Sequence, residues 1–258
     1  MSDGWLSTTM EVFMIAKKNY RIFFLLVFAC CAFRQEPVTD YRKEFGTAYK
    51  DAEELALELR PQLLRIAKDF NEDPRILEAI VFPEMVRYNI WYDYFETGSL
   101  CLLYSRFGSD YANFSVGYFQ MKPEFAESLE NFVSTFKEQE WAIHLQLGKF
   151  SVKDDFENRK ARVRRLQDPA WQLRYLIAFI ECCRIKHNLP KELSSQQAIQ
   201  FLATAYNTGW TNSTDEIWNR STKKFFHLEQ FNPSKRYVYA DISLNRYQEL
   251  GNSELVKQ

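Results

Sequence analysis

The amino-acid sequence predicts a mostly α-helical protein. Apolar residues recur at helix-like intervals from Tyr41 onward, several segments carry the residues that begin helices, and only 8 glycines and 8 prolines occur among 258 residues. Apolar residues make up 46% of the chain, which is enough for a sizeable core, and charged residues make up 26%, which is typical of a hydrated surface. The length suits one domain with appendages.

The charge balance and the spacing of histidine and cysteine exclude some classes of function. The net charge is −1, from 33 basic and 34 acidic residues, whereas a nucleic-acid-binding protein usually has a basic excess. A local basic run, Arg159 to Arg165, is typical of a solvated helix face. The three histidines and five cysteines lack the spacing of metal ligands, so we expect no metal and no other cofactor.

The N-terminus has the pattern of an export signal. Lys17, Lys18 and Arg21 precede an unbroken apolar run from Ile22 to Phe33. A spanning helix needs about 20 apolar residues, so this shorter run is interpreted as part of a secretory signal in residues 1–33. A start at Met14 gives the basic segment its usual length, and a buried core helix is the alternative interpretation.

Within this run, the VFAC segment that ends at Cys30 resembles a bacterial lipobox. The resemblance implies lipidation of Cys30 and a periplasmic or outer-membrane lipoprotein held at the membrane by its lipid anchor. Ordinary cleavage after Ala32 is the alternative. Export also permits a disulfide between Cys101 and either of the adjacent Cys182 and Cys183.

The chain after the signal divides into three parts. Residues 34–69 are expected to form a polar tether and an N-terminal helical extension, which Pro61 interrupts or restarts. Residues 70–224 are expected to form the main domain. Residues 225–258, whose apolar pattern is not decisive, are expected to form a C-terminal extension.

The main domain begins with a helix whose start is clearly marked. Asp73 suits the N-cap position and Pro74 suits the first helical position. Pro83 lies inside the same apolar pattern and is expected to bend the helix, because it removes a backbone donor. Glu84 follows it directly.

Similar signals mark the later helices. Pro123 is expected to begin one helix, Asp168 and Pro169 another, and Ser194 precedes a third. Gly209 is suited to end this last helix, because glycine readily adopts the conformation of a C-terminal cap.

Three segments, in this order, carry a family resemblance. They are Ile80-Val-Phe-Pro-Glu84, Ser115-Val-Gly-Tyr-Phe-Gln-Met-Lys-Pro123 and Ala203-Thr-Ala-Tyr-Asn-Thr-Gly209. The second and third are similar to the glycine–glutamine–proline and alanine–tyrosine–asparagine–x–glycine segments of soluble lytic transglycosylases. This resemblance implies a lysozyme-like α-helical domain of the goose-type class, with a substrate cleft.

The sequence departs from the family pattern in two places. The family's catalytic glutamate is usually followed by serine, and Met85 stands there in this chain. The stretch from Glu84 to Gly117 is also much longer than usual. Residues 91–110 are therefore interpreted as an insertion at the cleft that would alter substrate choice; the alternative is that the chain belongs to a divergent branch of the family.

Glu84 is the candidate catalytic acid. Glycosidic cleavage requires an acid that protonates the leaving oxygen, and a carboxyl stays protonated near neutral pH only where its surroundings raise its pKa. Apolar neighbours of this kind are Ile80, Val81, Phe82, Met85 and Val86. The alternative role for Glu84 is a structural ion pair, for example with Arg87.

The motifs contain no second carboxylate. Two-carboxylate glycosidases hold these groups roughly 5–9.5 Å apart, whereas a continuous helix would place Asp93 and Glu96 about 13 and 18 Å from Glu84 along its axis. This favours the one-carboxylate mechanism that the resemblance implies, in which the 6-hydroxyl of the sugar closes on C1. Hydrolysis with Asp93, Glu96 or Asp110 as second carboxylate is the alternative.

By resemblance, four residues have supporting roles around the acid, and Tyr118 is a further candidate because aromatic rings can stack on sugars. Gln120 would bind substrate or shape the cleft, Tyr206 would hydrogen-bond near the acid, and Asn207 would help to hold the cleft wall. Ser115 is a candidate for orienting the acid, and Tyr118 is a candidate for stacking on a sugar ring. Local packing or capping is the alternative for each.

Together these features predict an exported peptidoglycan lytic transglycosylase that cleaves the MurNAc–GlcNAc β-1,4 bond and leaves 1,6-anhydro ends. Its expected partners are glycan strands, the membrane through a lipid anchor, and envelope proteins, without nucleic acid. The alternatives are a hydrolytic muramidase, a non-catalytic glycan-binding envelope lipoprotein, and an unrelated α-helical envelope protein.

Overall fold

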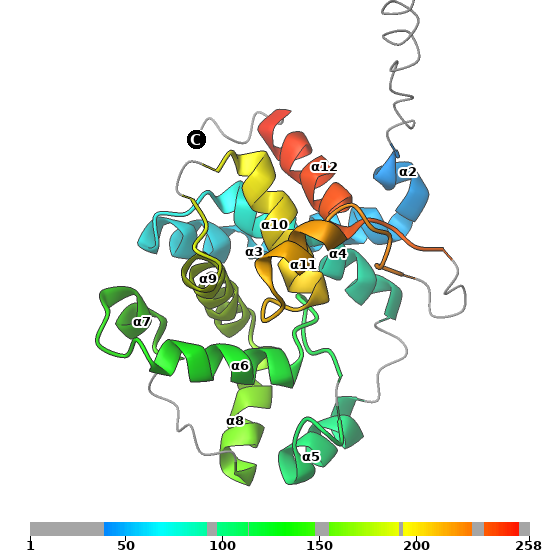
Figure 1. Ribbon diagram of the computed structural model, residues 1–258. Coiled ribbons are helices and arrows are strands. Elements are labelled where there is room, and N and C mark those ends of the chain that lie inside the picture. Colours follow the sequence, from blue (N-terminus) through cyan, green and yellow to red (C-terminus); the bar gives the residue numbers. More distant parts are fainter. Residues whose placement is uncertain are drawn as a thin grey trace, which may run out of the picture. The chain divides into compact units, whose positions relative to one another are not determined.

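The computed structural model describes residues 39–91, 97–112, 114–147, 155–190, 193–228 and 235–252. The mostly α-helical prediction is confirmed, because these residues form eleven helices and two isolated β-bridges but no strand (Figure 1). Residues 41–258 make one compact unit. The predicted signal at 1–33, with Cys30, lies outside the described residues, as do Asp93 and Glu96.

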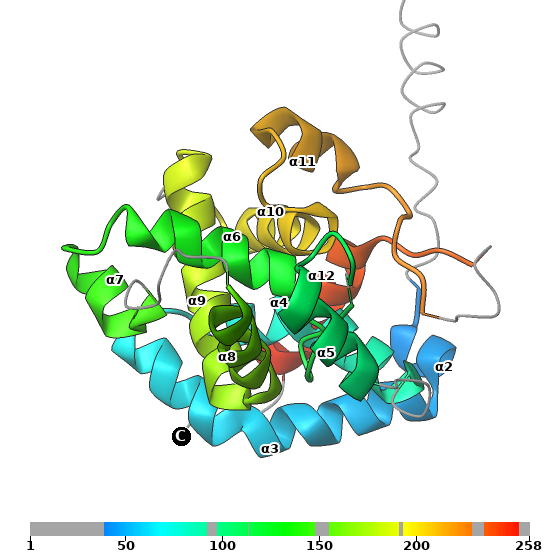
Figure 2. The same ribbon diagram turned by 90° about the horizontal axis from the view of Figure 1, so that it is seen from below.

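The helices follow one another with short connections, and Figure 2 shows the long α3 along one edge of the helical unit. Their bounds are α2 Tyr41–Phe45, α3 Thr47–Asp69, α4 Pro74–Trp91, α5 Thr97–Phe107, α6 Pro123–Ser134, α7 Glu140–Leu145, α8 Phe156–Gln167, α9 Pro169–Lys186, α10 Ser195–Thr208, α11 Thr214–Arg220 and α12 Tyr239–Asn252.

The predicted helix starts are confirmed. Helices α4, α6 and α9 begin at the expected prolines. The carboxylate of Asp168 accepts the amide N–H of Ala170 at 2.8 Å, which caps α9. Ser194 and Gln197 form a capping box at the start of α10, and Gly209 ends this helix with a φ of 105°.

The predicted interruption at Pro61 is wrong. Helix α3 continues through Pro61, which lies on its exposed side. A proline inside a helix costs about 3 kcal/mol because it removes a backbone hydrogen bond. The buried face of α3, which packs on α4, offsets that cost; it consists of Tyr49, Ala52, Ala56, Leu59, Leu63 and Ala67.

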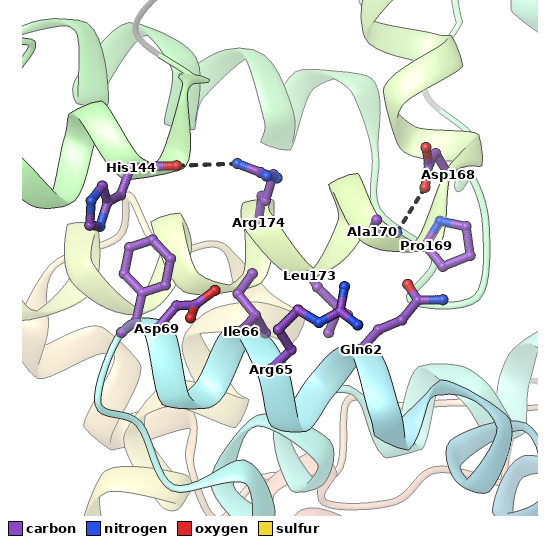
Figure 3. A pocket seen from close by; sticks show the side chains of 11 residues that line it. Gln62, Arg65, Ile66, Asp69, His144, Asp168, Pro169, Ala170, Leu173 and Arg174 are labelled. Carbon is purple, nitrogen blue, oxygen red and sulfur yellow. Dashed lines mark hydrogen bonds between the residues drawn. The ribbon is translucent and has the colours of Figure 1, made fainter.

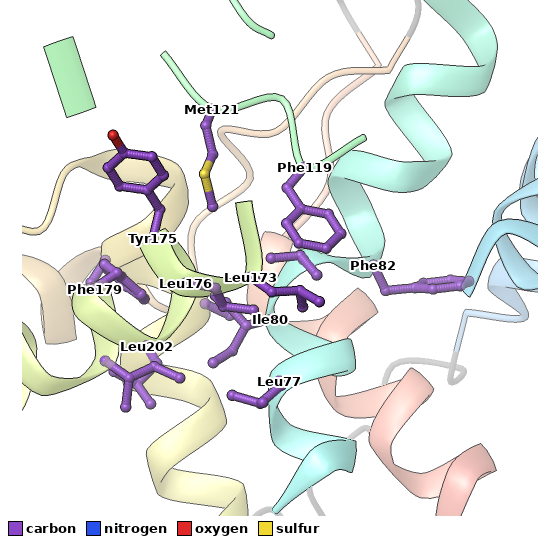
Figure 4. Close-up of a cluster of buried hydrophobic side chains, with 14 of the residues drawn as sticks. Leu77, Ile80, Phe82, Phe119, Met121, Leu173, Tyr175, Leu176, Phe179 and Leu202 are labelled. Atoms are coloured by element: carbon purple, nitrogen blue, oxygen red, sulfur yellow. The ribbon is translucent and has the colours of Figure 1, made fainter. Parts of the chain in front are cut away.

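Helix α4 is the central helix of the core. Every residue from 77 to 86 is buried, and α3, α10 and α12 all pack against it. This continuous burial explains why the helix is apolar on all sides instead of amphipathic. Figure 4 shows part of the core, with Leu77, Ile80 and Phe82 of α4 among Phe119, Met121, Leu173, Tyr175, Leu176, Phe179 and Leu202.

Helix α12 covers α4 and is joined to it by polar contacts. The hydroxyl of Tyr239 donates to the carbonyl of Ile80 at 2.9 Å. The guanidinium of Arg246 donates twice to Oε1 of Glu78, at 2.7 and 2.9 Å, and both side chains are buried. The segment 225–258, expected to be an extension, thus supplies one wall of the core.

Breaking the Glu78–Arg246 ion pair is expected to destabilise the fold strongly. In Arg246→Met, the buried carboxylate of Glu78 keeps only a distant contact with Arg60, at 3.5 Å. Removal of one partner from a buried pair costs about 3–5 kcal/mol, which urea denaturation would measure. The control is Arg220→Met, whose partner Glu216 is exposed, with an expected cost below about 1 kcal/mol; equal costs would contradict the interpretation.

Candidate active site

The three motif segments of the sequence lie near one another around Glu84. Helices α4 and α10 pack together. The hydroxyl of Tyr206, on α10, donates to the carbonyl of Phe119 at 2.8 Å, which ties α10 to the turn of residues 116–121. The charge of Glu84 affects the pKa of Tyr206, as expected for neighbouring groups.

The turn of residues 116–121 is a tight hairpin-like reversal. Val116 and Met121 exchange two backbone hydrogen bonds, at 2.9 and 3.1 Å. Gly117 and Gln120 both have positive φ angles, 70° and 49°. Glycine adopts this conformation without steric cost, which accounts for Gly117, whereas Gln120 is held in it by the turn.

Gln172 of α9 fixes this turn from inside the protein. Its side-chain amide donates to the carbonyl of Val116 at 2.8 Å and accepts the N–H of Phe119 at 3.4 Å. A Cβ atom on Gly117 would lie 2.1 Å from the amide nitrogen of Gln172 and 2.6 Å from the carbonyl oxygen of Leu166. Glycine is therefore required here by close packing as well as by conformation.

Glu84 is a buried carboxyl with incomplete polar contacts. It is 4% exposed, and its Oε2 atom lies 3.1 Å from Nη1 of Arg87 without forming a hydrogen bond. Burial raises the pKa of Glu84, while the positive charges of Arg87 and Lys122 oppose the rise. The net rise in the pKa of Glu84 favours the protonated form, as the catalytic interpretation requires. The contact with Arg87, in contrast, is the one expected if Glu84 has the alternative role of a structural ion pair.

Glu78, two turns earlier on α4, shows what a structural carboxylate on this helix looks like. It is as buried as Glu84, but it accepts two hydrogen bonds from Arg246 and lies 3.5 Å from Arg60. Glu84 has no comparable set of donors. The two carboxyls therefore differ in how well the protein stabilises their charge.

Two tyrosines near Glu84 act as hydrogen-bond donors. Burial, and next the negative charge of Glu84, raise the pKa of both Tyr206 and Tyr239, so both hydroxyls stay protonated. Tyr239 and Gln172 were not predicted as site residues. Tyr239 stands in a segment without a decisive pattern, and no local signal marks Gln172.

Gln120 and Tyr118 lie in the turn beside Phe119. Gln120 is buried, and its side-chain amide donates to the carbonyl of Gly117 at 2.9 Å, while its Oε1 atom has no hydrogen bond. The ring of Tyr118 packs edge-on against Tyr88, with 5.1 Å between centroids. Both residues therefore make local contacts that shape the turn.

The remaining predicted residues are less closely tied to Glu84. Ser115 is half-buried just before the turn, and Asn207 is half-buried beside Tyr206 in α10. Asp110 is exposed in the turn that follows α5. No contact of the described residues joins these three side chains to the Glu84 carboxyl.

A pocket of about 690 Å³ lies elsewhere, between α3, α7 and the start of α9 (Figure 3). None of the predicted site residues lines it. Its lining consists of Gln62, Arg65, Ile66, Asp69, Phe70, His144, Asp168, Pro169, Ala170, Leu173 and Arg174. Two of the polar groups are already occupied, because Asp168 caps α9 and Arg174 donates to the carbonyl of His144 at 3.1 Å.

Three further features of the described residues bear on the expectations from the sequence: the cysteines, the possible metal ligands and the apolar helices. Cys101, Cys182 and Cys183 are free thiols, so the disulfide that export permits is not formed among them. Burial raises the pKa of Cys182 and Cys183. Within the same described residues, acidic, histidine and cysteine side chains form no cluster suited to a metal, and no helix is long and apolar enough to cross a membrane.

Comparisons with protein-family models, with curated protein sequences and with solved structures found no match to this chain. The family resemblance therefore depends on the motif segments themselves and on their arrangement around Glu84.

Replacing Glu84 by glutamine is expected to change the pH dependence of stability. Because the folded-state pKa of Glu84 is raised, its stabilising effect is complete below about pH 4.5 and is lost as pH rises through the folded-state value. Glutamine does not titrate. The melting temperature of Glu84→Gln, relative to the parent, should therefore increase between about pH 4 and pH 8 in thermal denaturation; a relative decrease would mean that Glu84 is stabilised as the anion.

Gly117→Ala is expected to destabilise the fold by about 2–4 kcal/mol, from the cost of a left-handed conformation and from the contacts with Gln172 and Leu166. Gly98→Ala is the matched control, because Gly98 lies in α5 with open space around it. Alanine there should be neutral or stabilise by up to about 1 kcal/mol. Chemical denaturation of both variants would test this, and a neutral Gly117→Ala would contradict the packing requirement.

Proposed function

We propose that this protein is a peptidoglycan lytic transglycosylase in which Glu84 is the general acid and then the general base. The observation that carries the proposal is the state of Glu84: a buried carboxyl with a raised pKa and an Oε2 atom that lacks a hydrogen bond. An acid of this kind is what protonation of a glycosidic oxygen requires at neutral pH.

The proposed reaction uses one carboxyl twice. Glu84 donates its proton to the oxygen that links two sugars, and the C1–O bond breaks with positive charge developing at C1. The resulting carboxylate, stabilised by Arg87 at 3.1 Å, then accepts the proton of the 6-hydroxyl as O6 bonds to C1. Glu84 regains its proton, no water is consumed, and the product has a 1,6-anhydro end.

The neighbouring contacts support positioning roles. The hydrogen bond from Tyr206 to the carbonyl of Phe119 keeps α10 and the turn together beside α4. Gln120 has a free Oε1 acceptor in this turn, suited to a sugar hydroxyl. In this proposal residues 70–224 form a lysozyme-like domain with a substrate cleft, Ser115, Tyr118 and Asn207 line that cleft, and the chain is an exported lipoprotein anchored through Cys30.

One observation favours a non-catalytic, glycan-binding role instead. Glu84 is only 4% exposed and lies next to Arg87, so a substrate reaches the carboxyl only if the surrounding side chains move apart. A protein that binds glycan without cleaving it would not need such a movement.

Digestion of purified peptidoglycan sacculi tests the proposal, with products identified by mass spectrometry. Glu84→Gln is expected to lower the release of anhydro-muropeptides by about 10²–10⁴-fold, the usual contribution of a general acid. Glu124→Gln is the matched control, because Glu124 is an exposed carboxylate at the start of α6, beside the same motif, and should keep full activity.

Three results would change the assignment. Equal activity in the parent and Glu84→Gln would exclude Glu84 as the acid. Products with reducing ends would indicate a muramidase that uses water. Binding to sacculi without any product from the parent would support the glycan-binding alternative.

A further inference from the structure

Helix α5 and the turn after it expose large apolar side chains to solvent. Leu102, Leu103, Phe107 and Tyr111 are 59%, 37%, 53% and 67% exposed. Leu103, Phe107 and Tyr111 follow at intervals of four residues, and the rings of the last two pack together at 5.4 Å. Leu103 and Phe107, one turn apart in α5, therefore form an outward-facing apolar stripe, which Tyr111 extends from the turn after the helix through its ring contact.

Helix α8 has a matching stripe that combines an aromatic ring with positive charge. Phe156, Lys160 and Arg164 also follow at intervals of four residues, and the Lys160 ammonium lies 5.6 Å from the centre of the Phe156 ring. Helices α5 and α8 together contain six basic residues and one acidic residue, Glu157. Four of these basic residues, Arg106, Arg159, Lys160 and Arg164, are exposed or half-buried, whereas the other two are buried.

The two helices pack together, and hydrogen bonds near the end of α5 hold them in place. Arg159 of α8 donates to the carbonyls of Ser105 and Arg106, at 3.0 and 3.1 Å, near the end of α5. Figures 1 and 2 show α5 and α8 side by side in both views, beyond α6. We call the surface of Leu102, Leu103, Arg106, Phe107, Tyr111, Phe156, Lys160 and Arg164 the α5–α8 face.

The inner basic residues of α8 have a different role from those on the α5–α8 face. Arg162 and Arg165 are buried and donate to the two carboxylate oxygens of Glu130, at 2.9 and 2.7 Å. Their charge is compensated within the protein and fixes α8 to α6. Arg106 and Arg164, in contrast, are exposed.

We propose that the α5–α8 face docks on the surface of an anionic lipid bilayer. Exposed leucine and aromatic side chains enter the boundary between headgroups and acyl chains, and flanking lysine and arginine side chains bind anionic headgroups. The charge of the face is complementary to such a surface. This inference does not depend on Glu84 or on the proposed enzymatic activity.

Hydrogen–deuterium exchange of the full chain locates the contact directly, because binding through another segment would not protect α5 and α8. The probes are vesicles of phosphatidylcholine alone and vesicles that also contain about one third phosphatidylglycerol. We expect slower exchange in residues 97–112 and 155–167 with the anionic vesicles, little change with the neutral ones, and loss of the effect at high salt.

Paired variants distinguish this face from general hydrophobicity. The double variant Leu103→Ser with Phe107→Ser should raise the lipid concentration that gives half-maximal protection by at least about tenfold. The control pair is Leu57→Ser with Leu64→Ser, which removes leucines that are 56% and 49% exposed on α3 and should leave the protection unchanged. Circular dichroism would verify that both pairs keep the helical fold.

The charge contribution is tested in the same way. Arg106→Glu with Arg164→Glu should abolish the preference for anionic vesicles, whereas Lys50→Glu with Lys68→Glu, at exposed positions of α3, should preserve it. Protection limited to other segments would overturn the proposal. Protection of α5 and α8 that increases with protein concentration and needs no lipid would also overturn it, because the face would then bind a second copy of the chain.

Discussion

The structure depends on the burial of α4 on every side. A helix in this position leaves no water for its polar side chains, so each one must find its partners within the protein or lose its charge. Glu78 forms ion pairs with Arg246 and Arg60, and these pairs attach α12 and α3 to α4 at the centre of the core. Glu84 lies close to Arg87, but its Oε2 atom accepts no hydrogen bond. The same burial is thus matched by a full set of donors at Glu78, and at Glu84 it leaves a carboxyl with a raised pKa.

The second constraint is the close packing of the turn at residues 116–121 against α9. Gln172 replaces the hydrogen bonds that an irregular segment would otherwise make with water. Because Gly117 has no side chain, the turn can lie directly on α9. The carbonyl of Phe119 in this turn then accepts a hydrogen bond from the hydroxyl of Tyr206 on α10. These few contacts hold the turn of residues 116–121 together with α9 and α10, although the three segments are far apart in the sequence.

Local signals predicted the parts of the fold that local physics decides. Helices α4, α6, α9 and α10 begin where capping residues and prolines stand, because a cap acts within a few residues. Pro61 was misjudged because the packing of α3 on α4, a long-range effect, outweighs a local cost. The place of α12 in the core was not predicted, since its key contacts join residues far apart in sequence, such as Arg246 and Glu78. The candidate site shows the same division: the motifs predicted Tyr206, whereas Tyr239, near Glu84, and Gln172, which fixes the turn, act through contacts that no local pattern reveals.

Two opposite effects act on the pKa of Glu84, and their balance bears on the proposed chemistry. The charge of Arg87 stabilises the carboxylate and so lowers the pKa of Glu84, whereas burial stabilises the neutral acid and raises it by more. A group that must first release a proton and then recover it works best when neither state is strongly preferred. In the proposed mechanism, the positive charges of Arg87 and Lys122 counteract part of the rise that burial produces, so they help the carboxyl to release its proton as well as to hold it.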